Sequence, residues 1–369
     1  MELKKQNILF LTRTMALGGT ENVILQLCEI LKPLVNNIVV CSSGGINVSK
    51  LEEMNIKHYT IFDIENKNPI NIIKNIKSIK RILKEENITI VHSHHRMAAL
   101  YANLCCNNRI IKIANAHNTF YNRRFLTKLA YRNTQIIAVG EQVKKNLTEY
   151  FKIEKKCVNV IHNAIKSFNK KIVVDETIKK LKEDGNIVVA NVGRLSEQKG
   201  MEYYIKACTL LKEKCKKVKY LIVGSGEDED KLKKLVYENK MEDYIYFLGF
   251  RADIQNILSQ VDFVVLSSLW EGLPLTPIEA FSVGKTIVAT NVDGTPEIVI
   301  NDKNGLLVEP KDFDGLAESM MLLIKNDKIR RRLEKCALDT YIKEFSFDIL
   351  SKEYINYYIN CVGEKYEKK

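Results

Sequence analysis

The chain has 369 residues, more than one compact core usually holds, so its length predicts two domains. Hydrophobic residues make up 46% of it, yet no run approaches the roughly 18 apolar residues that a membrane-spanning helix needs. The apolar segment Ile8–Leu11 is also too short for a secretory signal. We therefore expect a cytoplasmic protein and exclude an integral membrane protein.

The net charge of +12 is concentrated in the first part of the chain. Residues 1–165 hold 24 Lys and Arg against 12 Asp and Glu, whereas the remainder holds 33 of each. Part of the excess lies in residues 71–84, where Ile72, Ile76 and Ile79 recur at helical spacing between lysines. Two interpretations stay open: a solvated face on a packed helix, or attraction to anionic lipid headgroups at the inner membrane face. No nucleic-acid-binding signature is present, so we expect no nucleic acid partner.

Nine cysteines are scattered without a CxxC pair or a zinc-ligand spacing. We expect reduced, mostly buried thiols.

In the first half, short β-branched runs alternate with amphipathic helical runs, which predicts a parallel sheet with helices on both faces. The expected strands are Asn7–Thr12, Ile38–Cys41, Thr89–His92, Ile110–Ala114, Gln135–Val139 and Val158–Ile161. Gly18 and Gly19 follow the first strand, where a glycine pair allows positive φ and a close approach of phosphate to backbone amides. A glycine doublet standing alone is more typical of an ordinary strand-to-helix turn.

Histidines gather near two of these strand ends. His117 closes the strand Ile110–Ala114, either as a structural residue or as one that exchanges a proton near neutral pH. In the run from His92 to His95, possible metal ligands alternate across a strand end, with no carboxylate or cysteine nearby in the sequence. We expect this run to line a binding cleft rather than hold a metal.

The polar segment 164–185 separates the halves and predicts a hinge. The expected strands beyond it are Ile187–Val192, Tyr220–Val223, Tyr244–Phe247, Asp262–Leu266, Thr286–Ala289 and Gly305–Val308. Ligands of such sheets bind beyond the carboxyl ends of the strands. Gly193, Arg194 and Lys199 follow one of these ends, where two cations would neutralise a diphosphate; the alternative is a pair of surface bases on a loop.

The stretch Trp270–Ala280 places two carboxylates, Glu271 and Glu279, on either side of a predicted helix start. The turn between them contains Gly272, Leu273, Pro274 and Leu275. Pro274 suits the first helical turn, and the amides around it would bind phosphate oxygens. The alternative is a pair of exposed, solvated glutamates.

Five short motifs occur in one order along nearly the whole chain, and together they resemble glycosyltransferase family 4. The motifs are Gly-Gly-Thr-Glu at 18–21, His117, Gly193-Arg194 with Lys199-Gly200, Val223-Gly224-Ser225-Gly226, and Glu271 with Glu279. The resemblance implies the GT-B fold, with two doubly wound Rossmann-like domains facing across a cleft. The acceptor-side domain would be 1–165 with a returning helix over about 346–369, and the donor domain 166–345.

The resemblance also implies a role for each motif. Gly18 and Gly19 would lie beside the donor diphosphate, and His117 would contact the transferred hexose. Arg194 and Lys199 would stabilise the leaving diphosphate. The remaining assignments are a sugar hydroxyl for Glu271, the ribose hydroxyls for Glu279, and the wall near the base for Gly224, Gly226 and Gly249.

Asp228-Glu229-Asp230 spells the D-x-D of metal-dependent sugar transferases, but here it opens a predicted helix, where acids favour the helix dipole. We therefore expect no metal and no other cofactor, since the nucleotide sugar is a substrate.

We expect a retaining enzyme that moves a hexose or N-acetylhexosamine from a nucleotide sugar, most simply a UDP-sugar, to a saccharide or polyprenyl-linked glycan. The many Lys, Ile and Asn residues suggest a low-GC bacterium and a capsule, lipopolysaccharide or teichoic-type pathway. Two alternatives are a non-catalytic nucleotide-sugar-binding partner of another transferase and a glycoside hydrolase using Glu271 and Glu279. The intact motif set disfavours the first, and the neighbouring cations Arg194 and Lys199 disfavour the second.

Overall fold

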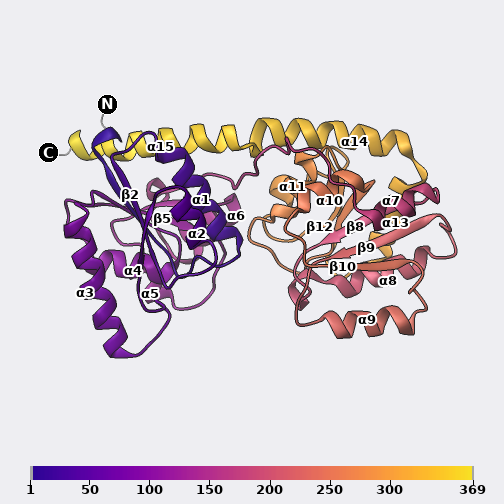
Figure 1. The fold of residues 1–369 in the computed structure, drawn as a ribbon, viewed down its shortest axis with the longest axis horizontal. Helices are drawn as coiled ribbons and strands as arrows, with labels where there is room; N and C mark the ends of the chain where they lie inside the picture. The colour runs from indigo at the N-terminus through magenta and orange to yellow at the C-terminus, as the bar shows by residue number, and fades with distance from the viewer. Residues whose placement is uncertain (1–2, 368–369) are drawn as a thin grey trace. The chain divides into compact units, whose positions relative to one another are not determined.

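The computed structural model describes residues 3–367 and divides into two compact units (Figure 1). The first unit contains the described residues up to Asn163 and those from Leu350 onward, and the second contains Ala164–Ile349. The last boundary therefore falls inside the final helix instead of before it. Ser346 forms an isolated parallel bridge with Ile165, which keeps the start of this helix with the second unit.

The first unit is built on a seven-stranded parallel sheet in the order β3-β2-β1-β4-β5-β6-β7. Its strands are β1 (Asn7–Leu11), β2 (Asn37–Ser42), β3 (Lys57–Thr60), β4 (Ile90–Ser93), β5 (Ile111–Ala116), β6 (Gln135–Ala138) and β7 (Val158–Val160). All six expected strands are confirmed. The additional strand β3 was missed because it is a short edge strand of polar residues, none of them fully buried.

Helices join these parallel strands. They are α1 (Gly19–Leu31), α2 (Val48–Glu53), α3 (Pro69–Glu85), α4 (Arg96–Cys105), α5 (Arg124–Ala130) and α6 (Glu141–Lys145), with shorter 3₁₀ or π turns at Leu3–Lys5, Asn146–Tyr150 and Lys155–Cys157. The final helix, α15 (Phe347–Glu367), begins at the end of the second unit in the chain and joins no strands. The basic helix α3 begins where the Asn68 side chain accepts a hydrogen bond from the Ile70 amide, with Pro69 at the first position. Figure 1 shows α3, α4 and α5 in succession, and neighbouring members of this series are in contact.

The second unit has a six-stranded parallel sheet in the order β10-β9-β8-β11-β12-β13. Its strands are β8 (Ile187–Val192), β9 (Val218–Val223), β10 (Ile245–Gly249), β11 (Phe263–Leu266), β12 (Ile287–Thr290) and β13 (Leu306–Val308). All six were expected. The helices are α7 (Glu176–Glu183), α8 (Met201–Leu211), α9 (Glu229–Glu238), α10 (Ile254–Gln260), α11 (Leu275–Ser282), α12 (Thr295–Ile298), α13 (Phe313–Lys325) and α14 (Asp327–Thr340), with short turns at Glu197–Lys199 and Tyr341–Phe345.

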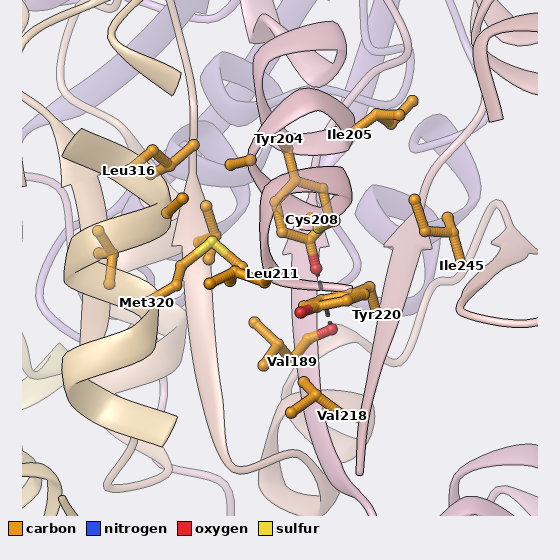
Figure 2. Packing of buried hydrophobic residues seen from close by; sticks show 14 of the residues in the cluster. Val189, Tyr204, Ile205, Cys208, Leu211, Val218, Tyr220, Ile245, Leu316 and Met320 are labelled. Atoms are coloured by element: carbon orange, nitrogen blue, oxygen red, sulfur yellow. Dashed lines mark hydrogen bonds between the residues drawn. The ribbon is translucent and has the colours of Figure 1, made fainter. Parts of the chain in front are cut away.

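The core of the second unit packs α8 and α13 against the sheet (Figure 2). Leu316 and Met320 of α13 lie beside the α8 side chains, and the Tyr204 hydroxyl donates a 3.1 Å hydrogen bond to the Val189 carbonyl. This bond satisfies a hydroxyl that burial would otherwise leave unpaired. The core thereby fixes β8, whose carboxyl end carries the predicted donor residues.

Strand order reverses once in each sheet, between β1 and β4 in the first unit and between β8 and β11 in the second. Loops leaving neighbouring strands on either side of such a reversal diverge to opposite faces and leave a crevice at the carboxyl ends. The predicted motifs Gly18-Gly19 and Gly193–Lys199 follow β1 and β8. Their positions match the place where ligands bind in this class of sheet.

Candidate functional site

In the second unit, the reversal brings the loop after β8 against the loop after β11. The Lys199 ammonium donates a 2.5 Å hydrogen bond to Glu271 Oε1, and only 17% of the lysine side chain and 7% of the glutamate side chain are exposed. The Ser267 hydroxyl joins the two loops, since it accepts from Asn191 Nδ2 and donates to the Lys199 carbonyl. Two residues predicted to act on different parts of the donor therefore form one ion pair.

Glu271 is held at three points. Besides Lys199, the buried Ser268 hydroxyl donates to Glu271 Oε1 at 2.6 Å, and the Glu271 amide donates to Asp293 Oδ2 at 2.8 Å. Asp293 itself has a left-handed backbone with φ of 42°, a conformation that costs energy for a non-glycine residue. The carboxylate is thus oriented before any ligand arrives.

Glu279 lies in α11 and differs from Glu271 in having no hydrogen-bond partner for its carboxylate within residues 3–367. It is partly buried, and this burial raises the pKa of Glu279 to about 7, although nearby Lys199 opposes the rise. An ionised carboxylate held in this way has free oxygen lone pairs for ligand hydroxyls. Pro274 is the residue before the helix, with ψ of 135°, so its expected place inside the first turn was wrong by one position.

Arg194 is placed differently from Lys199. Its exposed guanidinium pairs with Glu227 at 3.1 Å, and more than half of each side chain is exposed. The loop after β8 therefore places Lys199 against Glu271, whereas Arg194 lies at the surface.

The glycines of this site allow backbone segments to touch. A Cβ on Gly224, where φ is +143°, would lie 1.9 Å from the Gly193 carbonyl oxygen, and one on Gly226 would lie 2.3 Å from that of Leu195. Gly224 also donates its amide to the Gly249 carbonyl at 2.8 Å, which joins the ends of β9 and β10. A Cβ on Gly294 would meet the Gly272 carbonyl oxygen at 2.1 Å, so the turn after Glu271 is equally tight.

We expect Gly224→Ala to destabilise the protein by about 3 kcal/mol, because it combines an unfavourable φ with a collision between backbones. Gly284→Ala is the matched control, since its φ is +70° and its Cβ would meet nothing within 4 Å. Urea unfolding of the two variants measures the difference. Equal losses of stability would show that the contact with Gly193 does not constrain the fold.

Asp228, Glu229 and Asp230 lie at the start of α9 as expected, and Glu229 pairs with Lys233 one turn later. Across the part of the chain that the structure describes, no group of three or more His, Cys, Asp or Glu side chains is arranged to hold a metal. Transfer without a metal stays a prediction.

In the first unit, Gly18 and Gly19 do not adopt the positive φ that a glycine pair allows. Gly18 is extended, with φ of −178°, and Gly19 is already the first residue of α1, so neither adopts positive φ. A Cβ on Gly18 would instead lie 2.4 Å from Glu21 Oε2. Glu21 accepts a 2.7 Å hydrogen bond from the Thr14 hydroxyl, and its carboxylate lies in the space that a side chain at position 18 would need.

His117 directly follows β5 and is partly buried beside His94, the residue after β4. His117 Nε2 lies 3.3 Å from His94 Nδ1, and burial lowers the pKa of His117 to about 4. His92 lies deeper and is bonded through both ring nitrogens, to the Tyr358 hydroxyl of α15 at 2.7 Å and to Asn115 Oδ1 at 2.8 Å. The histidine run thus contains a structural residue in His92 and a partner of His117 in His94, while His95 accepts a hydrogen bond from the Met97 amide at the start of α4.

Sequence reasoning missed Ser268, Asp293 and the contact between His94 and His117. Ser268 and His94 both follow strand ends, which is a usable signal, and Asp293-Gly294 is a typical turn dipeptide. None of these signals says which loop the residue will touch.

The two parallel-sheet units, each with one reversal of strand order, have the architecture of the GT-B fold. Residues 17–167 match the model described as Glycosyltransferase Family 4, and residues 173–339 match the one described as Glycosyl transferases group 1. Together the two matches span most of the chain, which belongs to the glycosyltransferases that combine these two domains. No helix within residues 3–367 has the length and apolar character needed to cross a membrane.

Several proteins of similar sequence or structure are also glycosyltransferases. An Escherichia coli UDP-Gal:alpha-D-GlcNAc-diphosphoundecaprenol alpha-1,3-galactosyltransferase is 27% identical, with 93% of this chain and 95% of the relative covered. An uncharacterized glycosyltransferase of Methanocaldococcus jannaschii is 25% identical over 85% of each chain. Among solved structures, a Rickettsia africae glycosyltransferase has a TM-score of 0.84 at 23% identity, covering 97% of this chain and 99% of its own. The structure of Anabaena HepE in complex with UDP has a TM-score of 0.83 at 20% identity, and the match covers 96% of this chain and 100% of that one.

Proposed function

We propose that this enzyme transfers a hexose or N-acetylhexosamine from a UDP-sugar to a lipid-linked saccharide in cell-surface polysaccharide synthesis. The observation that carries the proposal is the preformed Lys199–Glu271 pair, since it sits at the strand-order reversal where a nucleotide sugar would bind. The names of two relatives, from Escherichia coli and Campylobacter jejuni, specify diphospho-undecaprenol acceptors. The Anabaena HepE structures contain UDP or UDP-glucose.

Each residue has a distinct part in the proposal. Glu279 accepts hydrogen bonds from the ribose hydroxyls, because its carboxylate has no partner of its own. Glu271 accepts one from a hydroxyl of the transferred sugar. Lys199 then interacts with the diphosphate, where negative charge grows as the bond from the anomeric carbon to the phosphate oxygen breaks. Arg194 would have to leave Glu227 to assist, which costs little for such an exposed pair.

The reaction would retain the anomeric configuration. The acceptor hydroxyl oxygen forms a bond to the anomeric carbon on the face that the diphosphate leaves, and its proton passes to the departing phosphate oxygen. UDP and the glycoside are the two products, and no metal or cofactor takes part. We also assign His117 a contact with the transferred hexose, as the family resemblance implies.

An acceptor held in a membrane also fits the surface of the first unit. Phe125 is 83% exposed and Tyr121 70% exposed, beside Arg123, Arg124 and Lys128. Apolar rings next to basic side chains suit an anionic lipid surface. We propose that this unit binds the inner face of the membrane peripherally.

The test is turnover by the purified protein in EDTA, with a panel of nucleotide sugars and an undecaprenyl-diphosphate-linked saccharide in phosphatidylglycerol vesicles. We expect release of UDP and one added sugar on the acceptor by mass spectrometry, and slower turnover in phosphatidylcholine vesicles. A protein that binds nucleotide but transfers no sugar to any acceptor would be a partner of another transferase. Release of free sugar without a nucleotide would indicate a hydrolase.

A further inference from the structure

His94 is a buried side chain whose only polar partner among the described residues is His117. It is 2% exposed, its Nδ1 lies 3.3 Å from His117 Nε2, and the two rings stack with an interplanar angle of 28°. Its other nitrogen, Nε2, is buried and has no hydrogen-bond partner in the part of the chain that the structure describes. The ring of Phe10 lies close by, at 5.7 Å between centroids.

His92 offers His94 no second hydrogen bond. The two rings are 4.5 Å apart, but both nitrogens of His92 are already occupied by Tyr358 and Asn115. Asn115 in turn donates to the Tyr354 hydroxyl at 2.6 Å. The hydrogen bonds that fix His92 therefore lead to Tyr358 and Tyr354 of α15. Among the described residues, His94 can form a hydrogen bond only with His117.

The position of the His94 proton follows from this geometry. Burial lowers the pKa of His94 well below the ordinary value and that of His117 to about 4, so both rings are neutral near pH 7. A neutral imidazole carries one N–H, and a buried N–H without an acceptor is rarer and more costly than a bare lone pair. The proton of His94 therefore belongs on Nδ1, where it can be donated to His117 Nε2.

We propose that His94 is a positioning residue that fixes the tautomer of His117. With Nε2 accepting from His94, His117 must carry its own proton on Nδ1, which makes no hydrogen bond within residues 3–367. His117 then presents a hydrogen-bond donor to its ligand, and it recognises a sugar oxygen as an acceptor. This last step rests on the proposed function, whereas the tautomers themselves do not.

The direct test is long-range ¹H–¹⁵N correlation of the histidine rings in the ligand-free protein at pH 7.5, with signals assigned through single variants. We expect both His94 and His117 as the Nδ1–H tautomer, which is the less common form in water. A proton on Nε2 of either ring would overturn the inference. Because no donor or acceptor is present, this measurement stands even if the enzyme transfers no sugar.

Kinetics of two His94 variants give a second test. In His94→Asn the side-chain amide can take the place of Nδ1–H and donate to His117, whereas His94→Leu fills the site without a donor. We expect kcat to fall about ten-fold in His94→Leu, the size of one lost hydrogen bond, and to recover within about three-fold in His94→Asn.

The control is His58→Asn, because His58 bonds Ser42 on the outer strands of the same sheet and should leave kcat unchanged. Equal losses in the two His94 variants, with thermal unfolding intact, would contradict a role through the donated proton. Absence of turnover by the wild type would refute the proposed function, and the tautomer measurement would then decide the inference alone.

Discussion

Replacing Lys199 by methionine should destabilise the protein by about 3 kcal/mol, because it leaves the buried Glu271 carboxylate without its cation. The Ser268 hydroxyl still donates its hydrogen bond to Glu271 Oε1 in this variant. We therefore expect a loss of stability at the lower end of the range for a broken buried ion pair. The same change should lower kcat by about a thousand-fold, since it removes the charge that faces the leaving diphosphate. Urea unfolding and turnover measure the two effects separately.

Two further variants sharpen this prediction. Lys233→Met removes an exposed pair with Glu229 and should cost less than about 1 kcal/mol. The double variant Lys199→Met with Glu271→Gln should recover much of the stability, because no buried charge is left unpaired, but none of the activity. If Lys199→Met were as stable as Lys233→Met, the pair would not be the buried interaction described above.

Glu279→Gln should make the ligand-free protein more stable at pH 8 by roughly 2 to 3 kcal/mol. The ordinary pKa of a glutamate is near 4.5, and burial raises that of Glu279 to about 7 in the folded state. Between these values the folded protein binds more protons than the unfolded chain, so wild-type stability falls as the pH rises from about 4.5 to 7. Glutamine does not titrate, so the difference between the two proteins should grow across this window and vanish at about pH 4, below the unfolded-state pKa.

Urea unfolding at about pH 4 and pH 8 checks this expectation, with Glu318→Gln on the exposed face of α13 as the control. Parallel pH profiles for the wild type and Glu279→Gln would contradict the raised pKa. The stabilising variant should also lose most of its affinity for nucleotide, because an amide cannot accept hydrogen bonds at both of its polar atoms. Such a gain in stability at the expense of binding is typical of a ligand site.

The sequence predicts the sheets well because buried parallel strands are continuous β-branched runs bounded by turns. It misses β3, whose exposed residues Lys57–Thr60 carry no such pattern. It also misses α7, because this helix lies in a polar segment and is identified mainly by the Asp175 cap, which accepts from two amides of the first turn. Short, exposed elements therefore escape prediction.

The sequence predicts which residues belong to the candidate site but not which of them are in contact. Lys199 and Glu271 are 72 residues apart in sequence, and only the order of strands shows that their loops meet. The same is true of His94 and His117, which follow adjacent strands β4 and β5. The positive φ allowed for at Gly18 is not adopted, and no sequence pattern shows that the Glu21 side chain lies beside this glycine.

The most direct measurement is thermal stabilisation of the wild type by UDP, GDP, ADP and their sugars in EDTA, with Glu279→Gln in parallel. A ligand at 100 times its dissociation constant stabilises by about 2.7 kcal/mol, enough for a clear shift. We predict stabilisation by UDP and UDP-sugars without metal, lost in Glu279→Gln. Failure of every nucleotide to stabilise the wild type, or an undiminished shift in the variant, would contradict the assignment of a nucleotide-sugar site to Lys199, Glu271 and Glu279.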